Sequence, residues 1–336
     1  MKHVTTLLLS CLFAMVATAA HGHEGDDADH SGSDEASHAV NKTTGDKRII
    51  EANGLPDHKP GQFPNRGNPN SISAQKYHFE MPLKPKANDE PRPIDRYTFG
   101  VAVNGVVFDP GTAEVWRPGD PIVSRPGRDT RRGPGDEPGR VWNYDAMGKM
   151  NLGIDANHAH VQPTGAYHYH GLPTGLITRL HKEKGGERML LIGYAADGFP
   201  IYAEYGYQKA DDSSSPEKKL KSSYQLKTGN RPKGEDGPGD KYDGTFVQDY
   251  EFIKGSGDLD ECNGRKGVTP EFADGTYYYV VVDAYPFIPR FFRGTPDSSF
   301  AKRMGPPPGD PGGPDGPPGR RGPPPGPGDG PRPDER

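Results

Sequence analysis

One stretch of the chain, residues 155–170, governs the interpretation of the whole sequence: DANHAHVQPTGAYHYH. Its four histidines form two pairs with a spacing of two, namely His158 with His160 and His168 with His170. Side chains two residues apart point to the same face of a β-strand. Each pair is therefore expected to share one face of its strand.

The connection between the two pairs predicts how they meet. Residues 163–165, Pro-Thr-Gly, suit a three-residue hairpin loop, with proline at the first turn position and glycine in the left-handed third position. With that loop, His160 opposes His168. His158 then opposes His170, so all four rings lie on one face with cross-strand Cβ separations of about 5 Å. A slip of one residue would place Tyr167 and Tyr169 beside His158 and His160 instead. Any site built from all four rings therefore depends on this register.

Three or four imidazole rings on one face are typical of a transition-metal site. Neutral imidazole nitrogen binds zinc, copper, nickel and iron, whereas magnesium and calcium select oxygen ligands. We therefore predict copper or zinc at these four histidines. A structural site would use all four ligands and a catalytic site would keep one position open, and both remain alternatives here. A third alternative is that the histidines alternate with tyrosines only for packing and hydrogen bonding.

Other candidate site residues lie further from this stretch. His58, in the loop Gly-Leu-Pro-Asp-His, is a weaker candidate to join the histidine cluster. Asp197 lies in an Asp-Gly turn and is a candidate general base, with simple turn formation as the alternative. Cys262 is predicted to be a buried thiol, with Cu(I) ligation as the alternative.

The middle of the chain, residues 49–300, carries mostly strand signals. Asn104 and Gly105 stand between two apolar runs and predict a hairpin with a type I′ turn. Residues 172–181 contain leucines four apart and predict a short helix. We expect a mainly β, or α+β, fold: a single large antiparallel β-rich domain with long loops and disordered termini.

Composition supports this division of the chain. Glycine (46) and proline (37) make up about a quarter of the 336 residues, which excludes a helix-dominated fold. Residues 301–336 are rich in both and predict a disordered, polyproline-type tail. The formal net charge of −5 does not favour a nucleic-acid partner. No apolar run is long enough to span a membrane, and the metal ion is the only partner predicted.

The N-terminus is predicted to be an export signal followed by a leader. Residues 1–20 combine a lysine, an apolar run and small residues before a cleavage point near Ala20, and these features predict a signal peptide and a secreted or periplasmic protein. Residues 21–48 are rich in histidine and acidic residues and are predicted to be disordered. Cleavage would expose His21 and His23, a free amine with histidine at the third position, which can bind Cu(II) or Ni(II) in a square plane.

The order of these motifs resembles the YHYH domain family, named for the tetrapeptide at residues 167–170. The resemblance covers roughly residues 49–300 and implies a secreted bacterial-type domain without an established reaction. One departure is Tyr278, at a position where related sequences often carry histidine, so the resemblance implies no ligand there. Its further blocks are residues 53–58, 63–65, 68–70, 160–165, 193–202, 242–244, 259–264 and 269–271.

The functional prediction follows from the histidine hairpin. We predict a secreted or periplasmic metal-binding protein that holds copper or zinc through this hairpin. One alternative is a metal-dependent hydrolase or oxidase with an open position on the same metal and with Asp197 or a tyrosine as the acid–base partner. The other alternative is a carbohydrate- or protein-binding module in which the histidines are structural.

Overall fold

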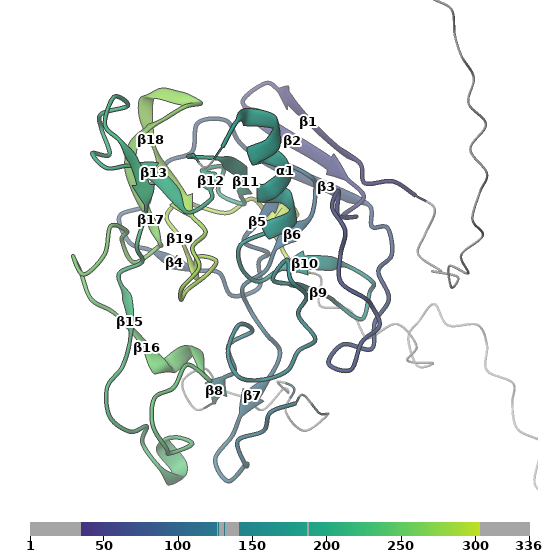
Figure 1. The fold of residues 1–336 in the computed structure, drawn as a ribbon, viewed down its shortest axis with the longest axis vertical. Helices are drawn as coiled ribbons and strands as arrows, with labels where there is room; N and C mark the ends of the chain where they lie inside the picture. Colours follow the sequence, from purple (N-terminus) through teal and green to yellow (C-terminus); the bar gives the residue numbers. More distant parts are fainter. Residues whose placement is uncertain (1–34, 126, 128–130, 132–140, 187, 303–336) are drawn as a thin grey trace, which may run out of the picture. The chain divides into compact units, whose positions relative to one another are not determined.

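The structure is a computed structural model that describes residues 35–125, 127, 131, 141–186 and 188–302 (Figure 1). The predicted signal peptide, most of the leader and the tail beyond residue 302 lie outside these residues. Within them the chain is mostly strands with a single α-helix, as the sequence predicted. Among the described residues, no helix has the length and apolar character needed to cross a bilayer.

An eight-stranded mixed sheet holds the histidine hairpin at one edge (Figure 1). Most neighbouring strands are antiparallel, whereas β12–β18 and β6–β10 run parallel. The prediction of a β-rich fold is therefore confirmed, with parallel contacts that the sequence did not indicate. In spatial order the strands are β17 (Gly264–Thr269), β18 (Phe272–Val280), β12 (Pro200–Tyr202), β11 (Leu191–Ala195), β5 (Gly100–Ala102), β6 (Val107–Phe108), β10 (Tyr167–Tyr169) and β9 (Ala159–Val161).

A three-stranded antiparallel sheet corrects the predicted extent of the leader. It contains β1 (Ala39–Thr44), β2 (Lys47–Ala52) and β3 (Tyr77–Pro82). The prediction that residues 21–48 are disordered is wrong for β1, which pairs with β2 along its whole length. The polar residues of β1 cannot form a core alone. The strand is stabilised by its backbone ladder to β2, which buries Ile50 in the core.

Short two-stranded sheets and turns complete the described chain. These elements are β13 (Tyr205–Tyr207) with β14 (Glu217–Lys219), β15 (Tyr224–Leu226) with β16 (Tyr250–Phe252), β4 (Arg92–Pro93) with β19 (Phe291–Phe292), β7 (Val115–Trp116) with β8 (Trp142–Asn143), and the 3₁₀ turns η2 (Gly234–Asp236), η3 (Val247–Asp249) and η4 (Ser298–Phe300).

The helix and the hairpin predicted in the middle of the chain are both present. Helix α1 (Thr174–Lys184) buries Leu176 and Leu180 in the main core and ends at Gly185, which is left-handed. The β5–β6 hairpin has a three-residue loop in which Gly105 has a positive φ and Asn104 does not. Since a type I′ turn needs positive φ at both central residues, that turn type was wrong.

Candidate metal centre

The histidine hairpin has the predicted register. His160 on β9 is paired directly with His168 on β10. The Gln162 amide donates to the Ala166 carbonyl, which closes the loop, and Gly165 takes the left-handed φ of +83° that its position requires. The local chemistry of the Pro-Thr-Gly loop was therefore sufficient to align the two strands.

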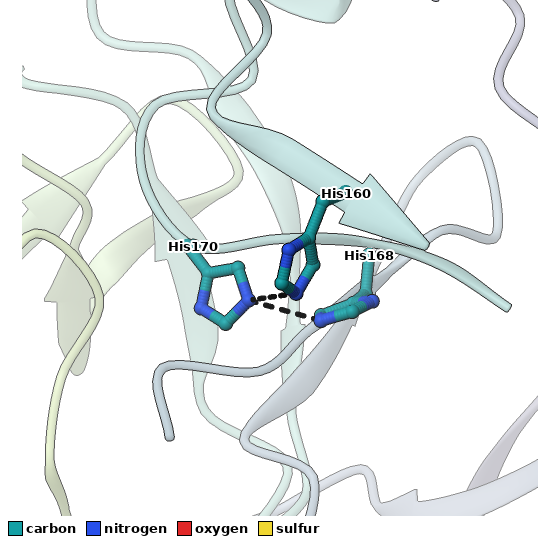
Figure 2. A group of neighbouring side chains, drawn as sticks. All are labelled: His160, His168 and His170. Atoms are coloured by element: carbon teal, nitrogen blue, oxygen red, sulfur yellow. Dashed lines mark hydrogen bonds between the residues drawn. The ribbon is translucent and has the colours of Figure 1, made fainter. Parts of the chain in front are cut away.

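Three of the four histidines converge on one point (Figure 2). His170 Nε2 lies 3.1 Å from His160 Nε2 and 2.9 Å from His168 Nε2. The three ligand atoms all lie within 4.8 Å of one another. Nitrogens bound to one tetrahedral zinc ion at 2.0–2.1 Å would be about 3.3 Å apart, so a small outward shift would admit an ion.

Backbone carbonyls orient two of these rings. His160 Nδ1 lies 2.8 Å from the Leu152 carbonyl oxygen, and His168 Nδ1 lies 3.1 Å from the Ala166 carbonyl oxygen. Because a carbonyl oxygen only accepts, each Nδ1 carries the proton and each Nε2 presents its lone pair to the cluster. Metal-ligating histidines are commonly fixed in this way. Every residue has a backbone carbonyl, so these two partners could not be predicted from residue type.

Burial keeps the three rings neutral. His168 is 2% exposed and His170 is 1% exposed, whereas His160 is half-buried. Removal from water lowers the pKa of His160. Burial, together with repulsion from His160, lowers the pKa of His168 to about 3. The pKa of His170 is also held well below its ordinary value, first by burial and then by repulsion from the other two rings. Neutral imidazole is the form that binds metal.

His158 does not join the cluster, although the sequence predicted four converging rings. Its carbonyl still accepts from the His170 amide, so the register holds at this position. Its φ is +53°, however, which takes the residue out of the strand alternation. Its ring lies away from the other three, with Nδ1 2.8 Å from the Leu172 carbonyl oxygen.

The weaker histidine candidates also lie outside the cluster. His58 Nε2 is 2.8 Å from the hydroxyl of Tyr169, whose side chain alternates with His168 and His170 and points to the other face of β10. His21 and His23 lie outside the described residues. The cluster of the described chain therefore offers three ligands and not four.

Asp197 lies elsewhere in the central sheet. It follows β11, which β5 and β6 separate from β10, a distance of about 14 Å at the usual strand spacing. Asp197 Oδ2 accepts from the Tyr279 hydroxyl at 2.5 Å and from the Gly294 amide at 2.8 Å. Burial raises its pKa to about 6. These contacts join the turn at Asp197 to β18 and to the loop at Gly294, and they do not bring Asp197 to the histidines.

Cys262 is a free and fully buried thiol, as predicted. It packs in the main hydrophobic core, and burial raises the pKa of its thiol. A raised pKa disfavours the thiolate, which is the form that binds metal. Cys262 is not part of the histidine cluster.

Two ion pairs near the cluster were missed from the sequence. Lys302 Nζ contacts Asp109 at 2.8 Å, and Arg290 Nη2 contacts Asp145 at 2.6 Å. The partners of each pair lie more than 100 residues apart in the chain, so no local pattern connects them. Only Asp109 could have been noticed in the sequence, because it stands at the end of the hairpin predicted around Asn104.

Fold and site together define a β-rich domain that brings three histidines within ligand distance of one another. The sequence model of one family, described as YHYH protein, matches residues 78–294. The chain belongs to this family, and the match lies within the limits that the sequence predicted. No curated protein and no solved structure matches the chain.

Proposed function

We propose that this protein binds a transition metal ion, copper or zinc, through His160, His168 and His170. The observation that carries the proposal is the convergence of three Nε2 atoms from a two-stranded hairpin. Imidazole nitrogen selects these ions over magnesium and calcium.

Hydrogen bonds alone leave this cluster poorly satisfied. The Nε2 atoms of His160 and His168 are both acceptors, because their protons are on Nδ1. His170 Nε2 has at most one proton, so it cannot make a full hydrogen bond to both neighbours. Its own Nδ1 is buried and has no partner among the described residues. A cation at the centre would accept all three Nε2 lone pairs at once, which no arrangement of protons achieves.

The composition of the N-terminus supports a proposed location outside the cytoplasm. The lysine, apolar run and small residues of positions 1–20 have the composition of a signal peptide. We propose that the mature protein is secreted or periplasmic and that its histidine-rich leader raises the local metal concentration.

The ligand count favours one second candidate function. Three protein ligands leave a fourth position on a tetrahedral ion, as in catalytic zinc sites. Bound water at such a position loses a proton near pH 7 and becomes a nucleophile. A metal-dependent hydrolase or oxidase is therefore the alternative, although Asp197 lies too far along the sheet to serve it as a base.

The first prediction tests metal stoichiometry in the full-length chain. A background with His21→Gln and His23→Gln removes the predicted copper- and nickel-binding motif of the leader. In this background we expect about one zinc or copper ion per chain by elemental analysis, and we expect none in His168→Ala. His160→Gln, at a less buried position, should also lose the ion and guards against a folding defect in the first variant.

His158→Gln is the matched control, because it alters a histidine of the same hairpin outside the cluster. It should keep the full stoichiometry. Retention of the ion in both His168→Ala and His160→Gln would overturn the proposal. Loss of the ion in His158→Gln alone would show that the wrong rings were assigned.

A further inference from the structure

An unpredicted carboxylate shares the face of the histidines. Val107 on β6 pairs with His168, so the two side chains share a face of the sheet. Asp109 directly follows β6 and comes two residues after Val107, so its side chain points to the same face. Asp109 is 3% exposed. Its Oδ1 accepts from Lys302 Nζ at 2.8 Å, and its Oδ2 accepts from Gln162 Nε2 at 3.3 Å. The charge of Asp109 is thus already matched by a lysine.

A second ion pair lies beside the first. Arg290 Nη1 donates to the carbonyl of Pro110, the residue after Asp109, at 2.5 Å. Its Nη2 donates to Asp145 Oδ2 at 2.6 Å, and Asp145 is 1% exposed. Lys302 and Arg290 are thus held by Asp109 and Pro110, directly after the strand β6 that pairs with His168.

The charges around the cluster leave a divalent ion only partly compensated. The three rings are neutral, and Asp145 and Asp109 are each paired with one cation. Asp155 also acts on His160. Its Oδ2 accepts from the Tyr167 hydroxyl and the Gly61 amide, which are neutral donors. A divalent ion would add two positive charges that no protein ligand offsets. An uncompensated charge in a buried place is costly, so a ligand with negative charge is favoured over a neutral one.

Among the described residues, no carboxylate or thiol is placed to bind the ion directly and supply that negative charge. In the described part of the chain, no fourth histidine, cysteine or carboxylate lies close enough to complete the cluster. The two described cavities, of about 260 and 360 Å³, are lined by other residues. Because His168 and His170 are almost fully buried, we expect only a small ligand to reach the ion.

We propose that the fourth position on the metal takes a small monovalent anion from solution, a hydroxide or carboxylate-type oxyanion, which Lys302 and Arg290 attract. This inference rests on the proposed function, because it needs the metal in place. In this arrangement Lys302 and Asp109 set the affinity for the anion. The ligands expected for the site are small carboxylates or related oxyanions.

The test uses Co(II), whose visible absorption reports its ligands, bound to the full-length chain with His21→Gln and His23→Gln. Acetate and acetamide are titrated separately in a buffer of non-coordinating anions. They have nearly the same size and differ in charge. We expect acetate to change the Co(II) spectrum with an affinity at least about tenfold above that of acetamide, which corresponds to about 1.4 kcal/mol.

Two variants test the assigned charges. Lys302→Met should weaken acetate binding severalfold, and Asp109→Asn should strengthen it, because the lysine is then unpaired. Lys42→Met removes an exposed ion pair with Glu51 on the three-stranded sheet and should leave acetate binding unchanged.

The outcomes separate this inference from the proposed function. If Co(II) binds but acetate binds no better than acetamide, the anion inference is overturned while metal binding stands. If both charge variants bind acetate like the parent, the assigned role of Lys302 and Asp109 is overturned. If Co(II) does not bind at all, the proposed function fails and the inference fails with it.

Discussion

The backbone of one residue reduces the number of candidate ligands from four to three. His158 adopts φ +53°, in the left-handed region that histidine visits more readily than most residues. Its ring lies against the chain at Gly171, where a Cβ would come within 3.1 Å of the His158 Cβ. The absence of a side chain at Gly171 therefore makes room for the diverted ring. A spacing of two in the sequence predicts a shared face only while both residues stay extended.

Gly165 controls the alignment of the two histidine strands, which gives the second prediction. Its φ is +83°, and a Cβ there would lie 1.9 Å from Ser73 Oγ. Left-handed strain alone costs about 1–2 kcal/mol of folding free energy. Gly165→Ala should destabilise the protein by more than this, because its Cβ would also clash with Ser73. The measurement is urea unfolding, together with metal affinity, which should fall as the hairpin shifts.

Gly185→Ala is the matched control for this change. Gly185 has a similar φ of +81° at the end of α1, and a Cβ there would meet nothing within 4 Å. The Gly185→Ala variant should lose only the stability that left-handed strain costs, and it should keep the metal affinity of the parent. Equal losses of stability in the two variants would show that the contact with Ser73 is relieved without cost.

The two strands that neighbour β10 differ in how far the sequence could predict their pairing. The alternation of tyrosine and histidine and the Pro-Thr-Gly loop are local, so they were sufficient to pair His160 with His168. The parallel neighbour β6 comes about sixty residues earlier, and no local pattern encodes that pairing. Asp109 reaches the histidine face only through β6. The pairing of the two histidine strands was therefore predictable, whereas the charges beside them were not.

The buried histidines of β9 and β10 predict how stability depends on pH in the metal-free protein. The pKa of His168 is about 3 in the folded chain and about 6.5 when unfolded, so the unfolded state takes up a proton first as the pH falls. The free energy of unfolding is therefore unaffected by this ring above about pH 6.5, and it decreases as the pH falls toward 3. The slope is about 1.4 kcal/mol per pH unit for each such histidine. Urea midpoints measured with a chelator from pH 7.5 to 4.5 provide the test.

A variant separates this effect from the titration of carboxylates. His168→Gln removes one titrating ring and should show a shallower loss of stability over the same pH range. A parent midpoint that stays constant between pH 6.5 and 4.5 would contradict burial of neutral rings. A variant with the parent's slope would show that other groups cause the pH dependence.

The whole molecule shows where composition alone was misleading. The segment before residue 49 was predicted to be disordered because its polar residues cannot form a core, yet β1 pairs with β2. Pairing of a strand with an existing sheet uses backbone groups, so polar residues do not prevent it. At the other end, Phe300 is 1% exposed and stacks on Phe79 with ring centroids 4.3 Å apart. The folded domain therefore begins earlier than composition suggested, at β1, and extends to Phe300 as predicted.

The contacts of Phe300 and Ala301 give the last prediction, which concerns truncation of the tail. Residues 305–336 hold 13 prolines and 10 glycines and few apolar side chains, so they have little to bury. Deletion of residues 305–336 should change the melting temperature by less than about 2 °C, which corresponds to about 1 kcal/mol or less in a domain of this size.

Deletion of residues 300–336 should have a much larger effect, because it removes the buried Phe300 ring and the bridge between Ala301 and Tyr97. Loss of one buried phenylalanine costs about 3–5 kcal/mol, or a decrease on the order of 10 °C in melting temperature. Calorimetry on the two truncated chains compares them directly. A similar large decrease in both would mean that the proline-rich tail packs on the domain, and a small decrease in both would mean that the Phe79–Phe300 contact contributes little to stability.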